Sequence, residues 1–110
     1  MEEKKEKFIE LYQPFFEMAF AGRVDDLIVN VFTDHLPTHF HILKKDHYEV
    51  RIGIDDLKIL SYKWQKDGEE ISSKDLKKVK EWLKQKNKKK KAITNKDNIE
   101  LIWDALNNKE

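Results

Sequence analysis

Cysteine and long hydrophobic runs are both missing from this chain. Without cysteine, disulfide bonds and thiolate zinc sites are excluded, and the composition fits a reducing cytoplasm. No stretch of the sequence approaches the roughly 18 apolar residues of a membrane helix, and the first residues lack the apolar core of a secretion signal. We therefore expect a cytoplasmic, soluble protein without a membrane partner.

The composition also limits the core. Hydrophobic and charged residues each make up 39% of the sequence, so the core must be small and the surface densely ionic. Three Trp, six Phe and three Tyr compensate with large side chains. A chain of 110 residues suffices for one core and is too short for two domains of ordinary size, so residues 1–110 are expected to form a single domain.

The N-terminal segment has a helical pattern. Apolar residues recur at helical spacing from Lys5 to about Ala21, and Gly22 is a natural stop. This predicts a helical extension over residues 1–22, kinked or shortened at Pro14. Its aromatic face is expected to belong to the core, with a groove for a partner as the alternative.

Strands and then helices are predicted for the remainder. An antiparallel meander of four strands is expected at residues 27–32, 38–43, 47–54 and 57–64. Two C-terminal helices follow, one over 73–86 with Ser72 as its N-cap and one from about 95 to 106. Residues 87–91 between them are expected to be a solvated connector that buries nothing. The predicted fold class is α+β, with both C-terminal helices on one face of the sheet and residues 27–106 as its core.

The register of the first hairpin can be predicted by matching its two faces. A three-residue loop, Lys44-Lys45-Asp46, sets Phe40 opposite Val50 and Ile42 opposite Tyr48, so one face is wholly apolar. The other face then pairs His41 with Glu49 and His39 with Arg51. A two-residue loop would set Ile42 against Glu49, so we favour the first register, in which Asp46 tolerates a left-handed conformation.

Histidine is scarce, and its placement makes the best candidate site. Of four histidines, three lie within seven residues, His35, His39 and His41, with Asp34 directly before them. Histidine changes charge and binds metals near neutral pH. Because residues i and i+2 of a strand share a face, His39 and His41 point the same way, while His35 lies across a turn. The fourth histidine, His47, is expected at the surface.

Three functions remain open for this cluster. On an exposed hairpin face, His39, His41, Glu49 and Arg51 would supply the base, acid and cation that RNA cleavage without a metal requires. The histidines could instead pair with Glu49 simply to organise the hairpin. In the third alternative, His35, His39 and His41 bind a divalent metal as a cofactor, with Asp34 or Glu49 completing the shell.

A basic segment offers a second candidate site. Between Lys74 and Lys91 there are ten lysines against Asp75 and Glu81, a net charge of about +8. We select Lys77, Lys80, Lys84 and Lys88 as residues that could follow a phosphate backbone, although such lysines are often only solvated. Trp82 and Trp103 are expected in the core rather than stacked on bases.

Several motifs carry a resemblance to a known family. They are Phe32-Thr33-Asp34-His35-Leu36-Pro37-Thr38-His39-Phe40-His41, Tyr48-Glu49-Val50-Arg51-Ile52, Lys80-Glu81-Trp82-Leu83 and Glu100-Leu101-Ile102-Trp103. In order and spacing, the stretch from Asn30 to Leu106 resembles the bacterial domain-of-unknown-function family numbered 4160. Thr38 departs from the family pattern, which has a second proline there, and the N-terminal extension is an addition.

The resemblance implies a genetic setting more than a chemistry. Members are often encoded beside another small protein, in an arrangement similar to toxin–antitoxin pairs. We therefore expect a partner encoded by a neighbouring gene and an effector that acts on RNA. A non-enzymatic interaction or regulatory module is the alternative.

Overall fold

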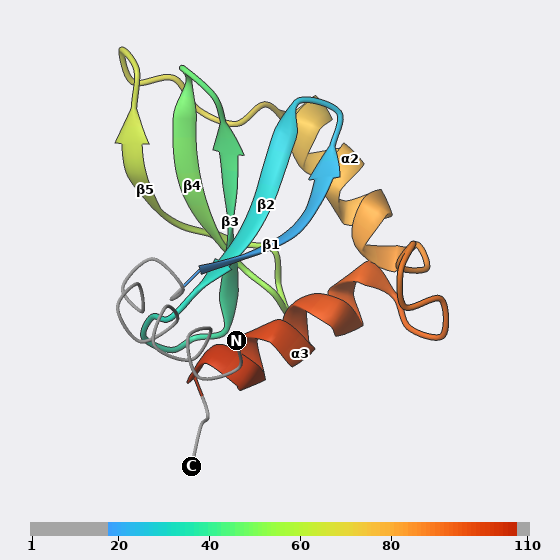
Figure 1. Cartoon of the computed structure of the whole chain (residues 1–110). Coiled ribbons are helices and arrows are strands. Elements are labelled where there is room, and N and C mark those ends of the chain that lie inside the picture. The colour runs from blue at the N-terminus through green and yellow to red at the C-terminus, as the bar shows by residue number, and fades with distance from the viewer. Residues whose placement is uncertain (1–17, 108–110) are drawn as a thin grey trace, which may run out of the picture.

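The computed structural model describes residues 18–107 as an antiparallel sheet with two helices (Figure 1). Five strands lie in sequence order, each paired with the next: β1 (Met18–Val24), β2 (Leu27–Phe32), β3 (His39–Lys44), β4 (Tyr48–Gly53) and β5 (Ile59–Gln65). The helices are α2 (Ser73–Lys84) and α3 (Asn95–Asn107). Neither of these two helices, within the described range, is long and apolar enough to cross a membrane. The predicted α+β class is confirmed.

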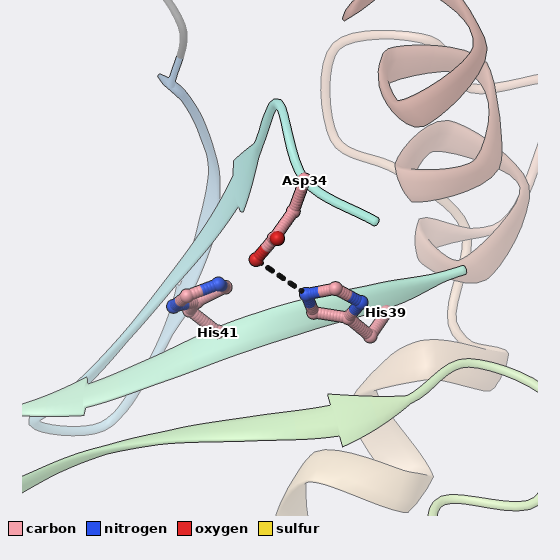
Figure 2. A group of neighbouring side chains, drawn as sticks. All are labelled: Asp34, His39 and His41. Carbon is pink, nitrogen blue, oxygen red and sulfur yellow. Dashed lines mark hydrogen bonds and ion pairs between the residues drawn. The ribbon is translucent and has the colours of Figure 1, made fainter. Parts of the chain in front are cut away.

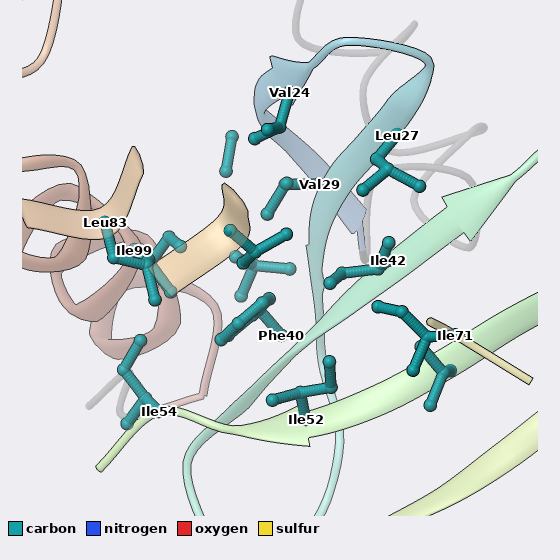
Figure 3. Close-up of a cluster of buried hydrophobic side chains, with 14 of the residues drawn as sticks. Val24, Leu27, Val29, Phe40, Ile42, Ile52, Ile54, Ile71, Leu83 and Ile99 are labelled. Carbon is teal, nitrogen blue, oxygen red and sulfur yellow. The ribbon is translucent and has the colours of Figure 1, made fainter. Parts of the chain in front are cut away.

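One face of the sheet and both helices form the hydrophobic core (Figure 3). Alternate residues of β3, such as Phe40 and Ile42, are fully buried there, as the period of a strand requires. Val79 and Leu83 contribute the apolar face of α2, and Ile99 that of α3. The two C-terminal helices therefore pack against the sheet, as the sequence predicted.

The prediction of an N-terminal helix ending at Gly22 is wrong for the residues that are described. Met18–Val24 is strand β1, so the sheet has five strands instead of four. β2 presents a row of backbone hydrogen-bonding groups, and pairing with β1 satisfies them, which outweighs the local helical pattern. The rest of the predicted extension, residues 1–17, lies outside the described residues.

Gly22 lies where β1 meets α2. The pairing of β1 with β2 shifts register between Phe20 and Gly22, which is a bulge. A Cβ atom on Gly22 would overlap the indole ring of Trp82. The glycine therefore lets α2 approach the sheet closely, and it does not end a helix.

The hairpin register is shifted by two residues from the prediction. Ile42 lies opposite Val50, and His41 lies opposite Arg51. The loop is Lys45-Asp46-His47, in which Asp46 has the expected left-handed conformation (φ 68°). A shift of two keeps every side chain on its predicted face, so the two faces are right. Matching apolar faces cannot distinguish registers that differ by two.

The start of α2 at Ser73 agrees with the sequence, whereas its end, at Lys84 instead of residue 86, and the connector do not. Ser72 caps α2, its hydroxyl accepting the backbone N–H of Asp75 at 3.0 Å. The expectation that residues 87–91 bury nothing is wrong for Asn87, which is only 9% exposed. Its side chain accepts the backbone N–H groups of Lys89 and Lys90, at 3.0 and 2.8 Å. An asparagine that folds its own loop in this way is a common turn device.

Candidate metal centre

Three side chains converge beside the start of β3. His39 and His41 project from the same face of this strand, and Asp34, in the loop after β2, points toward them (Figure 2). One ligand atom from each residue lies within 4.8 Å of the other two. The nearest pair is His39 Nε2 and Asp34 Oδ2, at 3.2 Å.

The end of α3 holds the Asp34 loop in place. The backbone N–H of Asp34 donates to the Asn107 side-chain oxygen at 2.8 Å. The Asn107 amide nitrogen in turn donates to the carbonyl of Phe32 at 3.2 Å and to that of Trp103 at 3.1 Å. Sequence reasoning missed Asn107 because no local pattern marks a contact between residues 73 positions apart.

The histidine face of the hairpin is buried, which corrects the expectation that it is exposed. His39, His41 and Glu49 are 3%, 2% and 8% exposed. The Phe32 ring lies 4.2 Å from that of His41, and the Trp103 ring lies 5.1 Å from that of His39. Aromatic residues from β2 and α3 thus cover a surface that the hairpin alone would leave open.

Each imidazole has its Nδ1 atom engaged. His39 Nδ1 lies 2.7 Å from the Pro37 carbonyl oxygen, and His41 Nδ1 lies 2.9 Å from the Glu49 carboxylate. Both partners are acceptors, so each Nδ1 carries the proton. In a neutral ring Nε2 therefore presents a lone pair, whereas the hydrogen bond between His39 Nε2 and Asp34, at 3.2 Å, requires a second proton on the His39 ring. His41 Nε2 is buried without a hydrogen-bond partner among residues 18–107.

The carboxylates of this region are held in their charged form. Partial burial favours the neutral form of Asp34, but hydrogen bonds from the His35 backbone and the His39 ring outweigh it and lower the pKa. The hydrogen bond from His41 lowers the pKa of Glu49 against the opposing effect of burial. Arg51 Nε lies 3.5 Å from Asp34 Oδ2 and adds a positive charge at the partly exposed side of the cluster.

The structure separates some of the predicted site residues. His35 is exposed. Among the described residues, the possible metal ligands that lie together are His39, His41 and Asp34, and His35 is not one of them. Arg51 lies opposite His41 instead of His39. His47 is partly exposed and pairs with Glu69 at 2.8 Å, close to the expected surface position.

The four selected lysines lie on two different surfaces. Lys77, Lys80 and Lys84 share the outer face of α2, where they border a shallow depression. Lys88 lies beyond the helix and lines a separate groove beside β1. One phosphate backbone following the helix would therefore meet only the first three.

Comparisons with known proteins give one match. A profile of the family described as a domain of unknown function (DUF4160) matches residues 27–92, a span that contains Asp34, His39 and His41 and ends before α3. No curated protein and no solved structure matches the chain. Because the matched span covers more than half of the sequence, the chain belongs to the DUF4160 family.

Proposed function

We propose that this protein binds a divalent transition-metal ion through Asp34 and the Nε2 atoms of His39 and His41. The observation that carries the proposal is the buried Nε2 atom of His41, which has no partner among the described residues, in a side chain that offers a ring nitrogen within 4.8 Å of ligand atoms of Asp34 and His39. A buried polar atom without a partner costs about 1–3 kcal/mol. A bound cation would remove that cost.

A proton between His39 and Asp34, in place of a metal ion, explains the arrangement less well. A proton on His39 Nε2 would form an ion pair with Asp34 at 3.2 Å, and that pair would be satisfied. His41 Nε2 would still lack a partner. A metal ion, in contrast, accepts both lone pairs and the carboxylate together, so it accounts for all three groups.

The surroundings of the ligands also suit a metal. Histidine ligands usually donate their other ring N–H to a carboxylate or a backbone carbonyl, which orients the ring. Glu49 and Pro37 fill these roles for His41 and His39. Around an ion at about 2.1 Å no two ligand atoms are more than about 4.2 Å apart, so a pair that lies the full 4.8 Å apart must approach by roughly 0.6 Å or more. Small rotations of the ligand side chains can supply this.

Two imidazoles and one carboxylate favour first-row transition metals such as zinc, iron(II) or cobalt(II) over magnesium or calcium, which prefer oxygen ligands. Three protein ligands leave at least one coordination position for water or another small ligand. The partly exposed Asp34 and the adjacent Arg51 mark the side from which such a ligand would enter. Metal-independent RNA cleavage by His39, His41, Glu49 and Arg51 has weaker support, because the first three side chains are buried.

Metal titration of the chelator-treated protein tests the proposal. We expect one equivalent of Zn²⁺ or Co²⁺ to bind, with Mg²⁺ unable to compete, and Co²⁺ to give the visible absorption of a site with nitrogen and oxygen ligands. Asp34→Asn and His41→Ala should each weaken binding at least about tenfold, since each removes a ligand. Isothermal titration calorimetry measures the stoichiometry and affinity.

His35→Ala and His47→Ala are the matched controls, because both remove a histidine outside the ligand group. Affinity equal to that of the unsubstituted protein is expected for both. If His35→Ala abolished binding, or if His41→Ala bound the metal as well as the controls, the assigned ligand set would be wrong.

A further inference from the structure

A groove of about 790 Å³ lies between β1, α2, the loop after α2 and α3, away from the metal centre. Figure 1 shows this loop, in orange, joining the two helices on the side of β1. Five basic and two acidic side chains line the groove. Its basic character comes mainly from Arg23 of β1 and from three consecutive lysines, Lys88, Lys89 and Lys90.

These four cations are available to an anion. The acidic Asp25 at the groove is already paired with Lys78, at 2.6 Å. None of the ion pairs within residues 18–107 engages Arg23 or the three lysines. The lysines are exposed, so an approaching ligand can reach them.

The loop after α2, which carries Lys88, Lys89 and Lys90, is held in one conformation by a network of buried asparagines. Asn87 binds the backbone of Lys89 and Lys90 and donates to Asn95 at 3.1 Å, and Asn95 donates to the Trp82 carbonyl at 2.7 Å. A merely solvated lysine run does not require such anchoring. Fixing like charges side by side is unfavourable by itself, and an anionic ligand would offset the repulsion.

Aromatic groups complete the groove. Phe20 of β1 borders the groove and is 60% exposed, and the half-buried Trp82 ring, which packs against Gly22, forms another part of the lining. A positively charged groove with exposed aromatic rings is the typical means of binding single-stranded nucleic acid, because bases stack on the rings while cations follow the phosphates. A duplex keeps its base faces stacked inside and offers none to Phe20.

We propose that this groove binds single-stranded nucleic acid, with Lys88, Lys89, Lys90 and Arg23 on the phosphates and Phe20 stacked on a base. Binding here is separate from the metal centre and from the lysines on the outer face of α2. RNA and DNA share the phosphates and the base faces that the groove would contact.

Fluorescence anisotropy with labelled oligo(U) and oligo(dT) of about 12 nucleotides tests this over a series of salt concentrations. Replacing Lys88, Lys89 and Lys90 together by Gln should weaken binding tenfold or more and reduce the salt slope by about 2, from about 0.7 per lysine in single strands. Phe20→Ala should weaken binding by about tenfold, the loss expected when one stacked base is removed. Circular dichroism verifies that both variants fold.

The matched control carries the same charge change on the other surface. Lys77→Gln, Lys80→Gln and Lys84→Gln together should leave the affinity within about twofold of the original, since these side chains do not line the groove. The proposal is supported if either oligonucleotide binds and the groove variants lose affinity as expected. A comparison of oligo(U) with oligo(dT) shows whether the groove prefers ribose.

Three outcomes would overturn the proposal. The first is an absence of binding to both oligonucleotides at low salt. The second is equal weakening by the two lysine triples, which would indicate general attraction to a basic protein. The third is equally tight binding of duplex or poly-glutamate, because neither presents base faces to Phe20.

Discussion

At the scale of single residues, Tyr48 carries an unfavourable buried hydroxyl. Tyr48 is 1% exposed, and its hydroxyl has no hydrogen-bond partner among residues 18–107. Tyr48→Phe removes this group without creating a cavity, so we expect the free energy of unfolding to rise by about 1 kcal/mol. Urea denaturation followed by fluorescence measures the change.

Tyr62→Phe is the natural counterpart, because its hydroxyl accepts the backbone N–H of the buried Ile71 at 2.9 Å. This variant should lose about 1–3 kcal/mol, since the N–H is left without its acceptor. If both variants shifted the stability in the same direction, the assignment of one unsatisfied and one satisfied hydroxyl would be incorrect.

The buried hydroxyl of Tyr48 also predicts that the stability depends on pH. Burial, with a smaller contribution from the Asp75 carboxylate, raises the pKa of Tyr48 above its ordinary value of 10.0. The neutral hydroxyl is therefore favoured in the folded state, and this contribution to stability is complete below pH 10 and is lost as the pH rises further. The advantage of Tyr48→Phe should consequently widen above pH 10 and stay constant between pH 7 and 9.

At the scale of elements, the close contact between β1 and α2 depends on Gly22. Because a methyl group at this position would overlap the Trp82 ring, Gly22→Ala should lower the free energy of unfolding by about 1–3 kcal/mol. Thermal and urea denaturation measure this loss. We expect overpacking between two elements to be the main cause, added to the backbone strain of a side chain at the φ of 159° that Gly22 adopts.

A double-mutant cycle separates these explanations. Combining Gly22→Ala with Trp82→Leu, which shortens the overlapping ring, should cost less than the sum of the two single changes. Strict additivity would show that the alanine acts through the backbone of β1 alone.

At the scale of the whole molecule, the proposed metal centre connects parts distant in sequence. His39 and His41 lie on β3, and the Asp34 loop is tied through Asn107 to the end of α3. Metal at 100 times its dissociation constant should therefore stabilise the fold by about 2.7 kcal/mol. For a domain of this size the Tm should rise by roughly 10–20 °C, which differential scanning calorimetry detects.

Asp34→Asn provides the control, since binding at least about tenfold weaker should cut the rise in Tm at the same metal concentration to about half or less, and a chelator should reverse the shift in the original protein. A stoichiometric metal that produced no shift in Tm would argue that it binds the unfolded chain equally well, against a folded site at Asp34.

Local patterns were enough to predict much of the fold. β2 was predicted with its observed bounds of Leu27–Phe32, because a short apolar run between turn residues specifies a buried strand. The N-cap at Ser72 and the shared face of His39 and His41 follow from neighbouring residues in the same way. Each of these features depends on spacings of a few residues.

The sequence by itself thus determined the α+β class, the faces of the hairpin and the position of the histidine cluster. Only the tertiary structure decided that Met18–Val24 is a strand, that His39 and His41 are buried and that Asp34 replaces His35 beside them. The physical reason is that these outcomes depend on partners remote in the chain. β2 supplies the pairing for β1 and, through Phe32, covers His41. Trp103 of α3 covers His39, and Asn107 holds the loop.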